Sequence, residues 1–150
     1  MNLQQQSLPQ ERLQPESQQM EHWPMAWQIR AIRGATTVSE NSVEAISEAV
    51  TEMLNALESH NQLDPSKIVS VTFSVTKDLD AVFPAAIARR RPHWDSVPLL
   101  DVQQMHVEGS LPRCIRLMIH IYLPAHNIQV NHAYLRGASQ LRPDLCRSAD

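Results

Sequence analysis

The segment Ile68-Val69-Ser70-Val71-Thr72-Phe73-Ser74-Val75 decides the fold class of this chain. Side chains that alternate with a period of two are typical of a β-strand, because successive residues of a strand point to opposite faces of a sheet. The alternation predicts one face made of Ile68, Ser70, Thr72 and Ser74, and another made of Val69, Val71, Phe73 and Val75. We therefore expect a β-sheet, and the flanking segments decide its class.

Strand and helix patterns alternate on both sides of this segment. Residues 27–35 read as a first strand, and a helix follows that Asn41 can cap, with Glu44 three residues later. Pro84 begins a second helix, which Pro92 stops. The order predicts an α+β or α/β fold, with a mixed β-sheet that carries its helices on one face. Further strands are expected at residues 97–102, 114–123 and 132–135, and the apolar stripe of the first helix is Val43, Ile46, Val50, Met53, Leu54 and Leu57.

Composition indicates one ordinary folded domain. The 150 residues are 43% hydrophobic and 19% charged, and a formal net charge of −3 does not fit a general nucleic-acid binder. Residues 1–24 are rich in Gln and Pro and are expected to be a disordered extension, whereas residues 25–150 should form the domain. No run reaches the ~18 apolar residues of a membrane span, so we expect a cytoplasmic protein without membrane contact.

The cysteines, histidines and methionines have no expected part in chemistry. Cys114 and Cys146 are far apart and should be free thiols in a reducing compartment. The seven histidines show no metal-ligand spacing, so neither a metal nor a cofactor is expected. The methionines expected in the core are Met53, Met105 and Met118.

Arginine carries nearly all of the positive charge, since Lys67 and Lys77 are the only lysines. Guanidinium groups bind carboxylates and phosphates in a bidentate manner, so the arginines are the leading candidates for substrate recognition. Arg33 directly precedes Gly34, where the chain can turn and expose it. Arg116 interrupts an apolar strand, which leaves two alternatives: a solvent-facing side chain, or one that is desolvated and paired.

A series of short motifs occurs in one order along the chain: Ile32-Arg33-Gly34-Ala35-Thr36-Thr37-Val38, Asp78-Leu79, Ala81-Val82-Phe83-Pro84-Ala85, Gln103-Gln104-Met105, Cys114-Ile115-Arg116, Tyr134-Leu135 and Leu141-Arg142-Pro143-Asp144-Leu145. In combination they resemble the monofunctional chorismate mutases of the trimeric α/β-barrel type. The resemblance runs from Arg30 to Leu145. It implies an isomerase of aromatic amino acid biosynthesis that rearranges chorismate to prephenate. It also implies a homotrimer with a barrel-like core and active sites between its subunits.

The resemblance assigns roles to the candidate residues. The reaction is a concerted Claisen-type shift that needs no metal, cofactor or covalent intermediate. The enzyme has to hold two carboxylates and to stabilise negative charge on the breaking ether oxygen. Arg116 would donate to that oxygen and to a carboxylate, while Arg33 and Tyr134 would bind a carboxylate.

Other positions match parts of the family's site that lie at its border. Phe83 and Arg89 match positions that the neighbouring subunit presents, and Leu141 and Arg142 match the C-terminal segment that closes the site. Arg89 also lies at the end of the second helix, where the helix dipole favours positive charge in any case.

The sequence departs from the family at Gln104, where a glutamate usually balances positive charge on the substrate ring. Gln104 can accept the same hydrogen bond but supplies no charge. Asp101 stands three residues earlier, at a position that is usually a cysteine. Our hypothesis is that Asp101 provides the carboxylate; the alternative is that Asp101 is an ordinary strand-end residue in a slow enzyme.

Two rival functions follow from the same residues. A catalytically weakened homologue would bind chorismate or prephenate as a regulatory module. A member of the similarly shaped trimeric imine deaminases would not require arginine at Arg33, Arg89 and Arg116 together, which disfavours that class.

Overall fold

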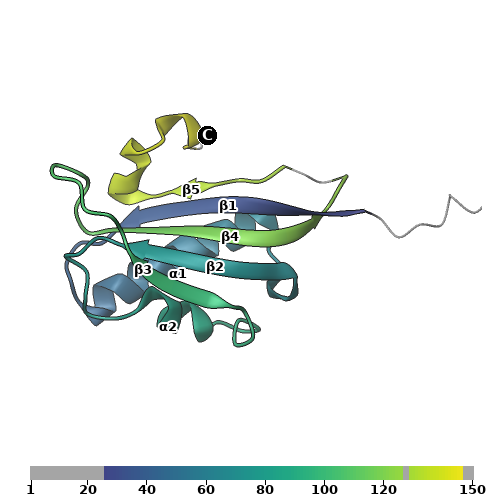
Figure 1. The fold of residues 1–150 in the computed structure, drawn as a ribbon, viewed down its shortest axis with the longest axis horizontal. Coiled ribbons are helices and arrows are strands. Elements are labelled where there is room, and N and C mark those ends of the chain that lie inside the picture. The colour runs from purple at the N-terminus through teal and green to yellow at the C-terminus, as the bar shows by residue number, and fades with distance from the viewer. Residues whose placement is uncertain (1–25, 127–128, 147–150) are drawn as a thin grey trace, which may run out of the picture.

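A mixed β-sheet of five strands runs through the protein, as Figure 1 shows. The computed structural model describes residues 26–126 and 129–146, so the predicted disordered extension at residues 1–24 lies outside the described residues. The strand order is β3-β2-β4-β1-β5, with β4 antiparallel to β1 and β2 and with parallel pairs at both edges. The strands are β1 Trp27–Thr37, β2 Ile68–Val75, β3 Leu99–Gln103, β4 Cys114–Pro124 and β5 Ala133–Tyr134.

Both α-helices cover the same face of this sheet (Figure 1). They are α1 Val43–Asn61 and α2 Pro84–Arg89, and short 3₁₀ turns lie at Pro65–Lys67, Arg136–Gln140 and Pro143–Leu145. The core lies between α1 and the covered face of the sheet. Burial of its apolar side chains supplies the main driving force for folding. The predicted fold, a mixed sheet with helices on one face, is confirmed. The largest fully buried side chains include Trp94, Phe73, Ile32, Ile46, Met53, Leu54, Leu57, Ile115 and Ile119.

The predicted cap of α1 at Asn41 is wrong. Ser42 is the N-cap, and its hydroxyl accepts the backbone N–H of Ala45 at 3.1 Å. Asn41 instead bonds the distant residues Asp80 and Ala81. Ser and Asn are about equally good N-cap residues. The contacts of Asn41 with Asp80 and Ala81 therefore decide that Ser42, and not Asn41, caps the helix.

Gly34 does not form the predicted turn. It lies inside β1, which continues to Thr37, and a Cβ placed on it would lie 3.0 Å from Leu57 Cδ1 and 3.2 Å from Met53 Sδ. The glycine therefore allows α1 to approach the sheet closely, and Arg33 is exposed by the alternation of the strand.

The alternation predicted for β2 holds only from Val71 onward. The pairing of β2 with β4 is irregular between Ile68 and Ser70, so Ile68 is buried whereas Val69 is exposed. An extra residue in one strand shifts the side chains on one side of it to the other face, which is the effect of a β-bulge.

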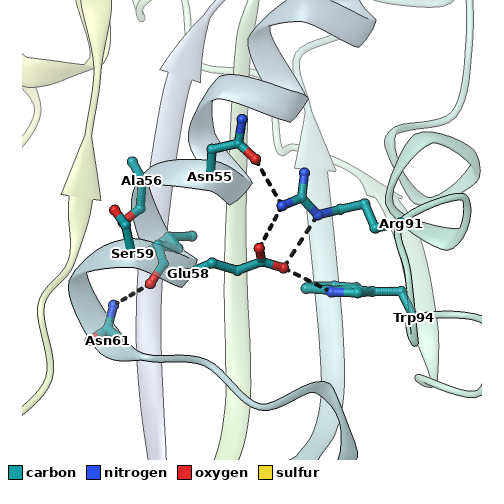
Figure 2. A network of polar contacts seen from close by, with 8 residues as sticks. Asn55, Ala56, Glu58, Ser59, Asn61, Arg91 and Trp94 are labelled. Atoms are coloured by element: carbon teal, nitrogen blue, oxygen red, sulfur yellow. Dashed lines mark hydrogen bonds and ion pairs between the residues drawn. The ribbon is translucent and has the colours of Figure 1, made fainter.

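A polar cluster fastens the loop after α2 to α1, and Figure 2 shows it. The carboxylate of Glu58 accepts Arg91 Nη2 at 2.7 Å and Trp94 Nε1 at 3.1 Å, and Asn55 accepts a further bond from Arg91. Trp94 is fully buried, so its indole N–H needs this partner. The cluster therefore fixes where α2 lies against α1.

Among the described residues no α-helix covers the other face of the sheet, although this face is rich in apolar side chains. Register places Ile29 beside Tyr122 and Arg33 beside Met118 on this open face. Met118 is 37% exposed and Met105, in the loop after β3, is 79% exposed, so their predicted place in the core is wrong. None of the helices in the described part of the chain has the length and apolar character to cross a membrane. The exposed apolar side chains of the open face are Trp27, Ile29, Leu100, Val102, Met118 and Tyr122.

Candidate active site

A hollow of about 510 Å³ lies on the open face of the sheet, where β1, β2 and β4 meet the C-terminal segment. It gathers most of the predicted substrate-binding residues, although they lie up to 109 positions apart in the sequence. Four strands, β1, β2, β4 and β5, and the turn after Arg136–Gln140 contribute to its wall. The predicted site residues in this wall are Arg33, Arg116, Tyr134, Leu141 and Arg142.

Arg116 fits neither of the alternatives that its sequence context leaves open. It pairs in register with Ala35 on one side and Ser74 on the other, so its side chain emerges on the open face. Its Nε is buried, yet it has no hydrogen-bond partner among the described residues. A buried donor without a partner is costly unless a ligand satisfies it. The residue as a whole is half-buried, but its Nε is desolvated and unpaired, so a ligand in the hollow could satisfy this donor.

Two further cations lie at the rim of this hollow. The backbone N–H of Arg33 donates to Nδ1 of His132 at 2.9 Å. The guanidinium of Arg33 forms no ion pair with the described residues. Arg142 binds Asp144 in a bidentate ion pair, with Nη2 2.7 Å from Oδ2. This contact raises the pKa of Arg142 and lowers that of Asp144. Both groups stay charged at neutral pH, so the rim is strongly polar.

A second hollow, of about 550 Å³, lies at the opposite edge of the sheet. It is bounded by the turn before α2 and by β3, and it contains Phe83 and Asp101. Phe83 is 70% exposed, an unusual position for an aromatic ring in a single chain. The linings of the two hollows share no residue.

Asp101 is held by the backbone at the start of α2. Its Oδ1 accepts the N–H of Ala85 at 3.0 Å, so it caps that short helix from the neighbouring strand. Burial raises the pKa of Asp101, while the Ala85 N–H and the charge of Arg89 oppose that rise. Arg89 therefore belongs to the same neighbourhood as Phe83 and Asp101.

Gln104 and Asp101 lie on opposite sides of the sheet. Asp101 faces the helix-covered side beside Phe73, and the alternation of β3 places residue 104 with the open side. The N–H of Gln104 binds the carbonyl of Val75 at 2.8 Å. Its Oε1 is buried without a partner among the described residues. Within one chain, Asp101 thus lines the second hollow, whereas Gln104 lines neither hollow and lies on the open side of the sheet.

Six residues that line the first hollow were not predicted as site residues: Gly34, Ala35, Thr72, Ser74, Leu117 and Met118. The polar set of β2 was a usable signal, because Thr72 and Ser74 pair with Met118 and Arg116 across the strands. A polar strand face next to an arginine in an apolar strand indicates a shared site rather than a solvated surface.

The fold and the first hollow indicate a class: an α+β protein in which three arginines, Arg33, Arg116 and Arg142, line one hollow on the open face of the sheet. Within the described residues, no group of His, Cys, Asp or Glu is placed to hold a metal ion. Comparisons with known proteins then give the family. Residues 29–145 match the model of chorismate mutase type I, and the chain belongs to this family of isomerases.

Individual relatives agree with this assignment. The chain is 39% identical to the chorismate mutase AroH of Bacillus subtilis over 117 residues, which cover 78% of this chain and 92% of the relative. It is 42% identical to the chorismate mutase AroH of Thermus thermophilus over 118 residues, or 78% and 96%. A solved chorismate mutase from Clostridium thermocellum is 42% identical, with a TM-score of 0.67, and the match covers 74% of this chain and 98% of that one.

Proposed function

We propose that this protein rearranges chorismate to prephenate and that Arg116 is its principal catalytic residue. The observation that carries the proposal is the buried, unpaired Nε of Arg116 in the wall of the first hollow. In the rearrangement the ether C–O bond breaks while a new C–C bond forms, and negative charge grows on the ether oxygen. A donor fixed at that oxygen stabilises the transition state more than the ground state.

The stabilisation that an arginine can supply is comparable with what the reaction needs. A rate gain of ~10⁶ corresponds to roughly 8 kcal/mol of transition-state stabilisation. One preorganised charged donor in a dry site supplies ~3–4 kcal/mol, and positioning of the reactive conformer can supply much of the rest. Arg33, Tyr134 and Arg142 would hold the two carboxylates and Leu141 would limit access of water, a proposal supported by their shared place in the wall of the first hollow.

We further propose that the active site is completed by a second subunit of a homotrimer. The first hollow holds Arg33 and Arg116, and the second holds Phe83 with Arg89 nearby. A neighbouring copy that brings its second hollow against the first would cover the apolar open face. Such a face is otherwise too apolar for contact with water.

This assembly also gives Asp101 a place in the reaction. We propose that Asp101 reaches the substrate of the adjacent subunit from the Phe83 side, while Gln104 accepts the ring hydroxyl from the Arg116 side. Oδ1 of Asp101 binds Ala85, and Oδ2 has no recorded protein partner among the described residues, so one oxygen is left for this purpose.

A cytoplasmic location fits this proposal, because chorismate is a metabolite and the two cysteines are free thiols. The rival role is a regulatory module that binds chorismate without turnover. The neutral Gln104 favours this role, because it supplies no negative charge to the reaction. Binding of chorismate without loss of its absorbance would favour that role.

Mixing two inactive variants tests the proposed function and assembly together. Arg116→Ala disables the first hollow and Arg89→Ala the second, so each alone should be nearly inactive. When equal amounts are unfolded and refolded together, about one site in four should combine two intact halves. The loss of chorismate absorbance should therefore recover to about a quarter of the wild-type rate. A mixture no more active than its parts would contradict the intersubunit site.

A further inference from the structure

Asn41 makes three side-chain contacts that the helix cap does not require. Its Oδ1 accepts the backbone N–H groups of Asp80 and Ala81, each at 3.1 Å, and its Nδ2 donates to Asp80 Oδ1 at 2.6 Å. Three of the four hydrogen-bonding positions of one exposed amide are thus directed at two consecutive residues about forty positions away. A surface asparagine without a task would bond water instead.

The segment that Asn41 holds presents Phe83. Only Val82 separates Ala81 from Phe83, and the ring of Phe83 is 70% exposed, so it is not fixed by packing of its own. Phe83 also provides no side-chain cap for α2, although it is the N-cap residue. The position of the ring therefore depends on what fixes the backbone before and after it.

Two carboxylates, Asp78 and Asp101, fix that backbone further out. Asp78 binds the hydroxyl of Thr76 and the N–H of Arg113, and Asp101 binds the N–H of Ala85. Asn41 holds the stretch between them and does not line the second hollow. It can therefore act on the second hollow only through the turn at residues 80–83, in which Asp80, Ala81 and Phe83 all line that hollow and Phe83 carries the largest exposed side chain.

Asn41 itself is held by a rigid element. It directly precedes Ser42, whose hydroxyl caps α1, and Ala45 and Ile46 in the first turn of α1 are buried in the core. The contacts of Asn41 thus connect the turn at residues 80–83 to α1, the longest helix among the described residues.

We propose that Asn41 is a positioning residue for the second half of the active site, in which it holds Phe83 in place for the substrate of the adjacent subunit. This inference rests on the proposed function. It assigns Asn41 no contact with substrate and no general role in stability, because its partners are exposed and such contacts contribute little to folding.

The mixed oligomer provides a test that separates positioning from stability. In the mixture described above, the Arg116→Ala chain supplies the Phe83 half of each restored site and the Arg89→Ala chain the Arg116 half. Asn41→Ala placed in the Arg116→Ala chain should raise KM by about 3- to 10-fold, the factor of one neutral hydrogen bond. The same change in the Arg89→Ala chain should leave KM unaltered. Equal effects in both chains, or none in either, would overturn the proposal.

A charge swap tests the inference in the ordinary enzyme. Asn41→Asp keeps the acceptor for both N–H groups but sets a carboxylate against Asp80, so KM should rise with little change in kcat. Adding Asp80→Asn restores a donor and acceptor pair with the roles reversed, and KM should return to near the wild-type value. A double variant as impaired as Asn41→Asp would overturn the inference. A parent mixture without recovered activity would count against the proposed assembly, and the swap would then decide the role of Asn41 by itself.

Discussion

Arg116 and Gln104 share a property at the scale of single residues: each has a buried polar atom without a partner among the described residues. Buried polar groups are nearly always satisfied in folded proteins, so each exception needs an explanation. Arg30 Nε is a third such atom, and of these three residues Arg116 is the one that lines the first hollow, where a ligand can satisfy it. Gln104 is proposed to face the same substrate. The ligand would have to accept from Arg116 and donate to Gln104. A carboxylated ether with a ring hydroxyl offers both.

The charge of Asp101 can be tested without disturbing the helix it caps. Asp101→Asn keeps an oxygen for the Ala85 N–H but removes the charge, and kcat/KM should fall by about 10- to 100-fold. Gln104→Glu added to this variant should recover much of the loss by restoring a carboxylate. An unchanged rate in Asp101→Asn would refute the proposed role.

The same residue gives a prediction for pH dependence. Burial raises the pKa of Asp101 above its usual value, and the proposed role requires the charged form, so activity should fall as the pH drops through that raised pKa. A rate-pH profile of the wild type should show this acid limb. Asp101→Asn should lack it, because its amide does not titrate.

Motifs predicted the site residues of the first hollow better than they predicted its surroundings. Arg33, Arg116 and Tyr134 stand in short motifs that can be read locally, and the structure brings them together. Thr72 and Ser74 were missed because only their pairing with β4 places them beside Arg116. Pairing between strands that are distant in sequence cannot be predicted from a short segment alone.

At the scale of elements, local patterns gave the helices and strands but not their exact bounds. The predicted strand at residues 97–102 is Leu99–Gln103, and the predicted start of α1 moved from Asn41 to Ser42. Both differences come from long-range contacts: pairing with β2 in the first case and the turn at residue 80 in the second. The bulge that exposes Val69 has the same origin, since β4 sets it.

The cluster around Glu58 should make a measurable contribution to stability. Glu58→Ala leaves Arg91 and the buried indole N–H of Trp94 without their acceptor, so the free energy of unfolding should fall by about 2 kcal/mol. Glu48→Ala is a matched control on the same helix, because Glu48 is 76% exposed and lies 3.6 Å from Arg136. Urea unfolding should show a change within about 0.5 kcal/mol for the control. Equal shifts in both variants would contradict a special role for the cluster.

At the scale of the whole molecule, one face of the sheet is covered by helices and the other exposes apolar side chains. A single sequence contains no direct signal for what covers such a face. The resemblance to a trimeric family supplied the expectation, and the two separate hollows in one chain support it physically.

A single charge on the open face should therefore break the assembly. Leu100 is 58% exposed on that face, so Leu100→Glu should leave the monomer folded but shift sedimentation from a trimer toward a monomer, with loss of activity. Val43→Glu is the control, because Val43 is 46% exposed at the start of α1, where a negative charge suits the helix dipole. A trimer that survives Leu100→Glu would place the interface elsewhere.

The rate of chorismate loss in the purified wild type, compared with Arg116→Lys, tests the central claim most directly. Lysine keeps the positive charge but loses the planar fork and the donor at Nε. The account predicts rapid loss of absorbance in the wild type and a rate at least about 100-fold lower in Arg116→Lys, with an unchanged fold by circular dichroism. Equal rates for the two proteins would contradict the assignment of Arg116 as the donor to the breaking ether bond.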